Sequence, residues 1–167
     1  NNLVPILVLV LLTATYAAFV MGGASLLPER VAVHFGMNGQ ADGWANRSEA
    51  TMFFEILNFV PAIFLVLALV MQVMPTGAFN LPNRDYWLAP ERRAQTVADI
   101  SRQLIWMGCL MVLFLAGIFW LTIQPNRLAP PHLPMSNFLL LLAAFLTATA
   151  VWTTLFLRRF FKQPPQT

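Results

Sequence analysis

Four long apolar segments limit what this chain can fold into more than any other feature of its sequence. They cover approximately residues 3–27, 49–74, 91–123 and 135–161. A helix of roughly 20 apolar residues crosses the hydrocarbon core of a bilayer, so each segment is long enough to span a membrane. Only 10% of the residues are charged, whereas a water-soluble domain carries about 25%. We therefore predict an all-α membrane protein, a bundle of four transmembrane helices that forms a single domain over residues 1–167.

The positively charged residues predict the orientation of this bundle. An even number of spans places both termini and the inner loop, residues 75–90, on one side of the membrane, and the outer loop, residues 28–48, on the other. The side with the termini carries seven Lys and Arg residues and the opposite side carries three. The positive-inside rule then places the N- and C-termini in the cytoplasm. The basic residues form no continuous face, so we expect the lipid bilayer, and no nucleic acid, as a partner.

Polar residues in the second apolar segment predict a distorted helix. Ser48 is the expected N-cap, with Glu49 in the first turn. Pro61 has no N–H to donate to the carbonyl four residues earlier, so it should kink the helix. Glu55 and Asn58 are three residues apart and share a helix face. Such a carboxylate either faces protein or water within the membrane or lies solvated at headgroup level, and the sequence leaves both readings open.

Local signals also mark the third and fourth segments. Pro90 suits the first position of a helix, and Asp99 and Arg102 have the spacing of an ion pair on one helix face. Four prolines between residues 125 and 134 predict an extended connector without a helix. The tail, residues 163–167, is expected to be disordered.

The outer loop holds the main candidate site, an ordered loop that caps the bundle. His34, Asn38 and Asp42 are four residues apart, and the glycines among them favour a compact loop over a helix. If they converge, one nitrogen and two oxygens would suit a metal ion or a headgroup amine. The same side chains would also suit recognition of a ligand or partner, or would satisfy each other and the loop backbone. Trp44 and Glu55 complete the candidate ligand-binding set.

The inner loop and the start of the third helix hold a second candidate surface. Its mixture of arginines and aromatic side chains suits contact with anionic lipid or a cytoplasmic protein, and equally an interfacial anchor for the helix. The candidate contact residues are Arg84, Asp85, Tyr86, Trp87, Glu91, Arg92 and Arg93.

The sequence contains no recognisable catalytic motif. No Ser or Cys nucleophile lies beside a histidine, no phosphate-binding glycine loop occurs, and the carboxylates are not visibly paired. Cys109 is the only cysteine, which excludes an intrachain disulfide. His132 is predicted on the same side of the membrane as His34, where the two could meet. We expect a protein that is not an enzyme and has no cofactor, and the sequence leaves metal binding open.

The outer loop carries a distinctive pattern: Leu27-Pro28, His34-Phe35, Gly39 and Asp42-Gly43-Trp44. This pattern resembles that of a bacterial membrane domain of unknown function that also forms the N-terminal part of Sdp-type toxin-immunity proteins. Ala32 and Gly36 depart from it, since the family often has Pro and Asn there. The inner loop, residues 83–93, is similar to that of short stand-alone members. The resemblance implies a multi-pass protein of the bacterial cytoplasmic (inner) membrane.

The resemblance and the two polar loops lead to three functional hypotheses. In the first, the outer loop recognises an extracellular ligand and the inner loop contacts lipid or a cytoplasmic partner, as in immunity members, which are thought to neutralise a secreted peptide toxin and relay its presence to a repressor. In the second, the chain is a small accessory subunit of a larger membrane complex or a homo-oligomer. In the third, it is an outward-facing metalloenzyme using His34, Asp42 and either Glu49 or Glu55.

Overall fold

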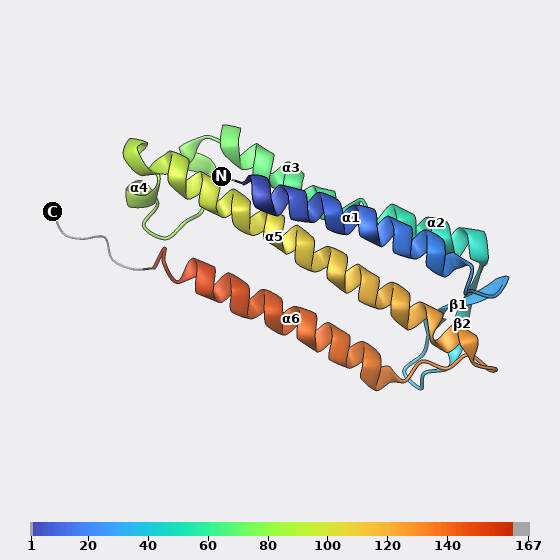
Figure 1. Ribbon diagram of the computed structural model, residues 1–167. Helices are drawn as coiled ribbons and strands as arrows, with labels where there is room; N and C mark the ends of the chain where they lie inside the picture. The colour runs from blue at the N-terminus through green and yellow to red at the C-terminus, as the bar shows by residue number, and fades with distance from the viewer. Residues whose placement is uncertain (1, 162–167) are drawn as a thin grey trace.

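The computed structural model describes residues 2–161 and confirms the predicted layout of four apolar helical spans (Figure 1). The long helices are α1 (Leu3–Ala24), α2 (Arg47–Leu57), α3 (Val60–Val73), α5 (Pro90–Ile123) and α6 (Met135–Leu157). The short elements are β1 (Arg30–Phe35), β2 (Ala41–Asn46), η1 (Thr76–Ala78), α4 (Arg84–Trp87) and η2 (Pro125–Arg127). This is a multi-pass membrane protein by the length and hydropathy of its helices. The four candidate spans are α1, the α2–α3 pair, α5 with η2, and α6. The expected disorder of residues 163–167 lies outside the described residues.

Helix α5 is the central element of the bundle. It packs against α1 and α3 on one side and against α6 on the other (Figure 1). The hairpin of β1 and β2 lies at one end of the bundle, and α4 lies at the opposite end, together with the start of α1 and the end of α6. The two polar loops therefore lie at opposite ends of the helices, because one span, residues 47–73, separates them.

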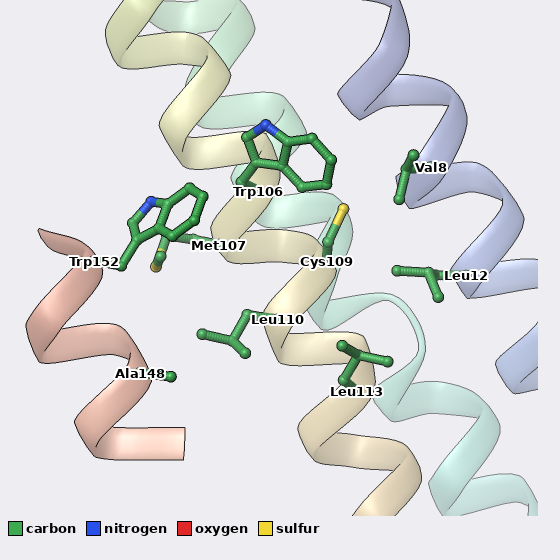
Figure 2. A pocket seen from close by; sticks show the side chains of 9 residues that line it. All are labelled: Val8, Leu12, Trp106, Met107, Cys109, Leu110, Leu113, Ala148 and Trp152. Atoms are coloured by element: carbon green, nitrogen blue, oxygen red, sulfur yellow. The ribbon is translucent and has the colours of Figure 1, made fainter. Parts of the chain in front are cut away.

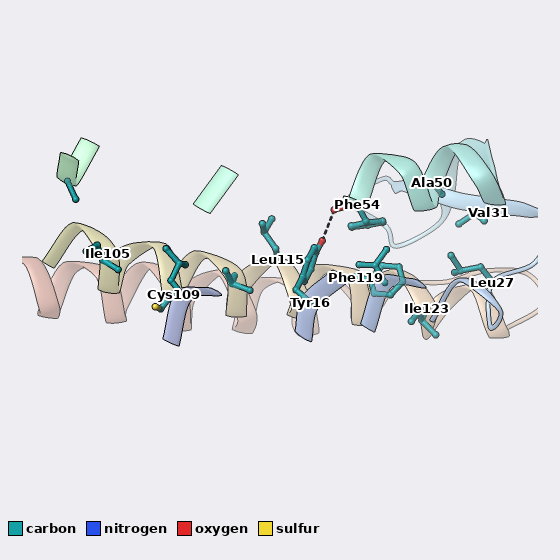
Figure 3. Close-up of a cluster of buried hydrophobic side chains, with 14 residues drawn as sticks. Tyr16, Leu27, Val31, Ala50, Phe54, Ile105, Cys109, Leu115, Phe119 and Ile123 are labelled. Carbon is teal, nitrogen blue, oxygen red and sulfur yellow. Dashed lines mark hydrogen bonds between the residues drawn. The ribbon is translucent and has the colours of Figure 1, made fainter. Parts of the chain in front are cut away.

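The main core runs along α5, where α1, α2 and α3 pack against it, from Ile105 to the hairpin end (Figure 3). Phe119 on α5 is fully buried and makes edge-on contacts with Phe54, at 4.9 Å between ring centroids, and with Phe19, at 5.2 Å. Tyr16 is also buried and donates a hydrogen bond from its hydroxyl to the carbonyl of Phe54, at 3.1 Å. These contacts join three helices through aromatic side chains, whose large area gives much of the packing energy.

Helix α6 stands apart from this core. None of its residues is buried, and it contacts the rest of the bundle through α5. In a bilayer its apolar side chains face lipid or another protein, so its exposure is compatible with a span at the edge of the bundle.

The second apolar segment is one span and is distorted just before Pro61, as predicted, but the distortion is a break between two helices and not a kink in one. Helix α2 ends at Leu57 and α3 begins at Val60, with Asn58 and Phe59 between them. Pro61 is in the first turn of α3, where its missing N–H costs no hydrogen bond. The predicted N-cap is also wrong: Asn46 caps α2, and the Glu49 carboxylate accepts from the backbone N–H of Asn46 at 3.0 Å.

Two loops contain more regular structure than predicted. The outer segment, expected to be a compact loop, forms an antiparallel hairpin of β1 and β2. The connector that was expected to exclude helix begins with the 3₁₀ turn η2, and only the part after it is extended. The inner loop contains η1 and α4, while the predicted start of the third helix at Pro90 is confirmed.

Candidate functional site

The hairpin brings His34 and Asp42 together on the exposed surface. His34 lies opposite Gly43 in the register of β1 and β2, and register shifts on both sides of His34 mark an irregular, bulged strand. A Cβ added to Gly43 would lie 2.6 Å from the Cβ of His34, so a glycine is needed for this close approach. The Nδ1 atom of His34 contacts the Oδ1 atom of Asp42.

The contact with Asp42 orients the His34 ring. Both side chains are exposed, at 73% and 55% of their surfaces, so either can be reached from outside. Because Nδ1 faces the carboxylate, Nε2 is the ring nitrogen that is directed toward other partners. This pair confirms that two of the three predicted loop residues meet.

Asn38 lies in the turn of the hairpin, where its side chain is hydrogen-bonded to Gln40. Its side-chain oxygen accepts from the backbone N–H of Gln40, and its side-chain NH₂ donates to the Gln40 side chain, each at 3.1 Å. These hydrogen bonds close the turn between the strands. Gly39 in the same turn has φ +78°, a conformation that glycine adopts without strain.

Trp44 lies on a separate part of the hairpin. The guanidinium of Arg30 stands over its ring at 5.0 Å from the centroid, a cation–π arrangement across the two strands. Trp44 and Arg30 line a shallow polar depression together with Glu29 and Glu49. Trp44 therefore stabilises the hairpin, and 41% of its surface stays exposed.

Asn126, which the sequence did not single out, fixes the hairpin to the end of α5. Its Oδ1 accepts from the backbone N–H of Ala32 at 2.7 Å, and its Nδ2 donates to the Ala32 carbonyl at 2.9 Å. The side chain also donates to the carbonyl of Thr122 at 2.8 Å. Asn126 thus acts as a buried extension of the β-ladder, a role that its position in a proline-rich loop does not reveal.

The segment before α6 pairs with the turn of the hairpin. Gln40 and His132 form an isolated antiparallel bridge, and the N–H of Leu133 donates to the carbonyl of Gly39 at 2.9 Å. His132 therefore meets the hairpin through Gln40 and Gly39, and the structure gives no contact between His132 and His34 among the described residues. Both ends of the α5–α6 connection hold the hairpin in place.

A pocket of about 320 Å³ opens between the hairpin and the helices. The hairpin contributes Val33, His34, Phe35 and Met37 to its wall; α5, α6 and the connector contribute Ile118, Leu121, Thr122, Leu133, Met135 and Phe138. The wall is largely apolar, and His34 is its only titratable side chain. A concave apolar site with few polar groups at its edge is typical of ligand binding.

The predicted metal set is not brought together. Within residues 2–161, no three His, Cys, Asp or Glu side chains are grouped so that they could hold a metal ion. Glu49 caps α2 instead of joining His34 and Asp42. Within the described residues, the acid–imidazole pair in contact at the hairpin is His34 with Asp42, which is fewer donors than a structural zinc site uses.

Glu55 lies inside the bundle region and not in the hairpin. Its neighbour Asn58 donates a side-chain hydrogen bond to the carbonyl of Thr13 in the middle of α1, at 3.2 Å. Glu55 therefore cannot share a ligand with His34 and Asp42, although the sequence grouped them. Its place beside the α2–α3 break is a separate feature of the molecule.

At the α4 end, several residues of the second candidate surface are already held by contacts within the protein. Arg92 stacks over Tyr86 at 4.0 Å, and Arg84 contacts the carboxylate of its neighbour Asp85 at 3.3 Å. Arg93 donates to the carbonyl of Met74 at 2.8 Å and so fixes α5 to the end of α3.

The other aromatic residue of that surface belongs to a packing cluster. Trp87 contacts Phe160 at 5.3 Å between ring centroids, and its carbonyl accepts from Thr96 at 2.9 Å. The exposed residues of this surface are Arg84, Asp85 and Glu91, whereas Tyr86 and Arg92 are half-buried.

Asp99 is the centre of an ion network at this end. Its carboxylate contacts Arg102 at 3.2 Å, as the spacing predicted, and also Arg159 at 2.9 Å. Gln95 donates to it at 3.2 Å. Arg159 follows α6, so the network attaches the end of α6 to α5. Sequence spacing could not reveal a partner 60 residues away.

A second pocket of about 320 Å³ lies along α5 between α1 and α6 (Figure 2). Val8 and Leu12 form one wall, Ala148 and Trp152 the other, and Trp106 lies between them. Every lining residue is apolar or aromatic apart from the Cys109 thiol. Such a groove at membrane depth has no polar group to orient a specific ligand.

Comparison with known proteins identifies one family in the part of the chain that holds the hairpin. Neither the curated proteins nor the solved structures contain a match to this chain. The predicted resemblance to a membrane domain of unknown function is confirmed for the segment that runs from α1 through the hairpin to the α2–α3 break, whereas the link to immunity proteins stays a prediction. Residues 8–59 match the family model of DUF1648, a domain of unknown function.

Proposed function

We propose that this chain is a non-enzymatic membrane receptor whose hairpin binds an amphipathic extracellular ligand. The pocket between the hairpin, α5 and α6 is the observation that carries the proposal. Its apolar wall suits an aliphatic or aromatic group, and His34 at its edge suits a polar or charged group of the same molecule. An amphipathic peptide has both, as does the secreted peptide that the family resemblance suggests.

The contacts around the pocket support recognition without a large rearrangement. Asn126 and the Gln40–His132 bridge hold the hairpin against both helices that line the pocket. The His34 ring is oriented by Asp42, which reduces the entropy lost when a ligand binds. A ligand that contacts β1 and α6 together would also change the position of α6, the least packed helix, and so reach the opposite end of the bundle.

The test uses the full chain in lipid nanodiscs and a fluorescent Leu/Lys amphipathic peptide as the probe. We expect saturable binding above that of empty nanodiscs. His34→Ala should weaken it about tenfold, because one hydrogen bond to a polar ligand group is lost. Val33→Trp should abolish it by filling the pocket, whereas Val10→Trp, at a comparably exposed valine on α1, should not. Equal binding by all variants would reject the proposal.

The proposed orientation places the hairpin outside the cell and α4 in the cytoplasm. It is supported by the seven Lys and Arg residues on the side of the termini against three on the other. A bacterial cytoplasmic membrane is the setting that the family resemblance suggests. A reporter fused to the C-terminus should score as cytoplasmic, and an external score would reverse the assignment.

A second candidate function is that of an accessory subunit in a larger membrane complex. The specific observation in its favour is α6, a 23-residue helix without a single buried residue. Native mass spectrometry after gentle extraction from the native membrane should then show the chain with a defined partner or a second copy. A bare monomer would count against this function and leave the receptor proposal unaffected.

A further inference from the structure

Glu55 lies near the middle of the membrane-spanning region. Thr13 is the eleventh of the 22 residues of α1, and its carbonyl accepts a hydrogen bond from the Asn58 side chain. Tyr16, one turn further along α1, donates to the carbonyl of Phe54 (Figure 3). Glu55 directly follows Phe54, so it lies about one turn from the level of Thr13. This position favours the reading in which Glu55 faces protein within the membrane.

The surroundings of Glu55 present hydrogen-bond acceptors without matching donors. Among the hydrogen bonds of residues 2–161, none reaches the buried Oε1 of Glu55 or the buried Oδ1 of Asn58. Unpaired acceptors in hydrocarbon are costly, and a carboxylate there is usually paired with a cation.

The outer face of α2 around this site is apolar and exposed. Met52, Phe53, Ile56 and Phe59 each expose more than half of their surface, with Phe59 at 74%. Glu55 is half-buried between this face and α1. A transmembrane helix that packs along α2 would cover these side chains and reach the Glu55 carboxylate from the side.

A second copy of the chain does not supply the missing charge. The spans contain no Lys or Arg at this depth: residues 3–24, 48–73, 103–126 and 135–157 lack both residue types. The complementary cation must therefore come from another molecule. A guanidinium supplies a positive charge and several donors at once.

We propose that Glu55 and Asn58 at the α2–α3 break form an intramembrane docking site for a partner's transmembrane helix that carries an Arg or Lys near its centre. The pairing would neutralise the carboxylate through its accessible part, while the apolar face of α2 packs against the partner. This site lies on another face of the molecule from the hairpin pocket and does not depend on the proposed recognition there. If the chain is an accessory subunit, the site predicts that its partner carries a basic residue within a transmembrane helix.

The experiment measures resonance energy transfer between the full chain in lipid vesicles and synthetic polyleucine transmembrane peptides. One peptide carries a central Arg, one carries Leu at that position, and one carries the Arg two turns from the centre. We expect the central-Arg peptide to associate about tenfold more tightly than the Leu peptide, with the off-centre Arg peptide close to the Leu peptide.

Variants of the chain separate this site from general helix association. Glu55→Gln should remove the preference for the central Arg, and Asn58→Ala should reduce it. Glu49→Gln, which changes the other carboxylate of α2, should retain it, and circular dichroism should show equal helix content in all variants. An unchanged preference in Glu55→Gln, or no preference in the wild-type chain, would overturn the proposal. The latter result would mean that a proton alone neutralises Glu55.

Discussion

The side-chain amide of Asn126 forms two hydrogen bonds with the backbone of Ala32, and these connect β1 to the end of α5. The two residues are 94 positions apart, and both are buried. The hairpin is thus an integrated part of the helical bundle. Asn126 and the bridge between Gln40 and His132 together hold it over the pocket.

Replacing Asn126 with alanine should therefore loosen the hairpin. The Ala32 N–H would stay buried without an acceptor, which costs about 2 kcal/mol in the free energy of unfolding. Denaturant unfolding in detergent, followed by tryptophan fluorescence, measures this loss, and hydrogen exchange at Ala32 should accelerate. Asn137→Ala, at an exposed asparagine of α6, is the matched control and should have little effect. Equal stability of the two variants would contradict the assigned role.

Gly39→Ala should also destabilise the hairpin. Gly39 has φ +78°, and a Cβ there would collide with the carbonyl oxygen of Leu133 and the ring of His132. The strain should cost roughly 1–3 kcal/mol.

Gly22→Ala provides the comparison for Gly39, measured by the same unfolding assay. Gly22 is inside α1 and has no atom within 4 Å of an added Cβ. Alanine favours a helix by up to about 1 kcal/mol relative to glycine, so this variant should be as stable as the wild type or more stable. If Gly39→Ala left the free energy of unfolding unchanged, the turn would be able to move away from His132 without loss of stability.

Arg159→Ala should release the end of α6 from α5. Asp99 is buried and would keep only Arg102 as an ion partner. We expect the free energy of unfolding to fall by about 2 kcal/mol, which is less than the cost of breaking a fully buried ion pair. Spin labels near Asp85 and Phe161 should report a broader distance distribution in this variant. Arg158→Ala, at the exposed neighbour, should leave the distribution narrow. Identical distributions for both variants would reject the attachment.

Tyr16→Phe should weaken the contact between α1 and the end of α2. The hydroxyl of Tyr16 satisfies the Phe54 carbonyl, since the N–H of Asn58 instead donates to the carbonyls of Glu55 and Ile56. Loss of this hydrogen bond should cost about 1 kcal/mol. Thermal unfolding in mild detergent measures the change, with Tyr86→Phe at the α4 end as the control. A stability equal to that of the control would mean that packing of the ring alone holds α1 and α2 together.

The sequence predicted the candidate sites less completely than it predicted the spans. His34 and Asp42 contact each other, as one of the predictions for the outer loop required. Asn38 instead closes the turn of the hairpin, and Glu55 lies beside the middle of α1, away from the hairpin. Equal spacing of polar residues does not define a site when the backbone between them pairs as strands, because the register of the strands decides which side chains meet.

The sequence by itself determined those features of this protein that depend only on residues close together in the chain. Apolar length fixed the four spans, Pro90 marked the start of α5, and the three-residue spacing of Asp99 and Arg102 predicted their ion pair. Each of these signals acts within a few turns of one helix, so composition and spacing are sufficient to read it.

Only the tertiary structure decided the pairings between distant residues. The contact of Asn126 with Ala32, the attachment of Arg159 to Asp99 and the depth of Glu55 beside α1 all depend on how the helices pack. Many packings are compatible with four apolar spans, because lipid and protein offer apolar side chains similar surroundings. Hydropathy therefore defines the helices, and the few buried polar contacts between them define the sites.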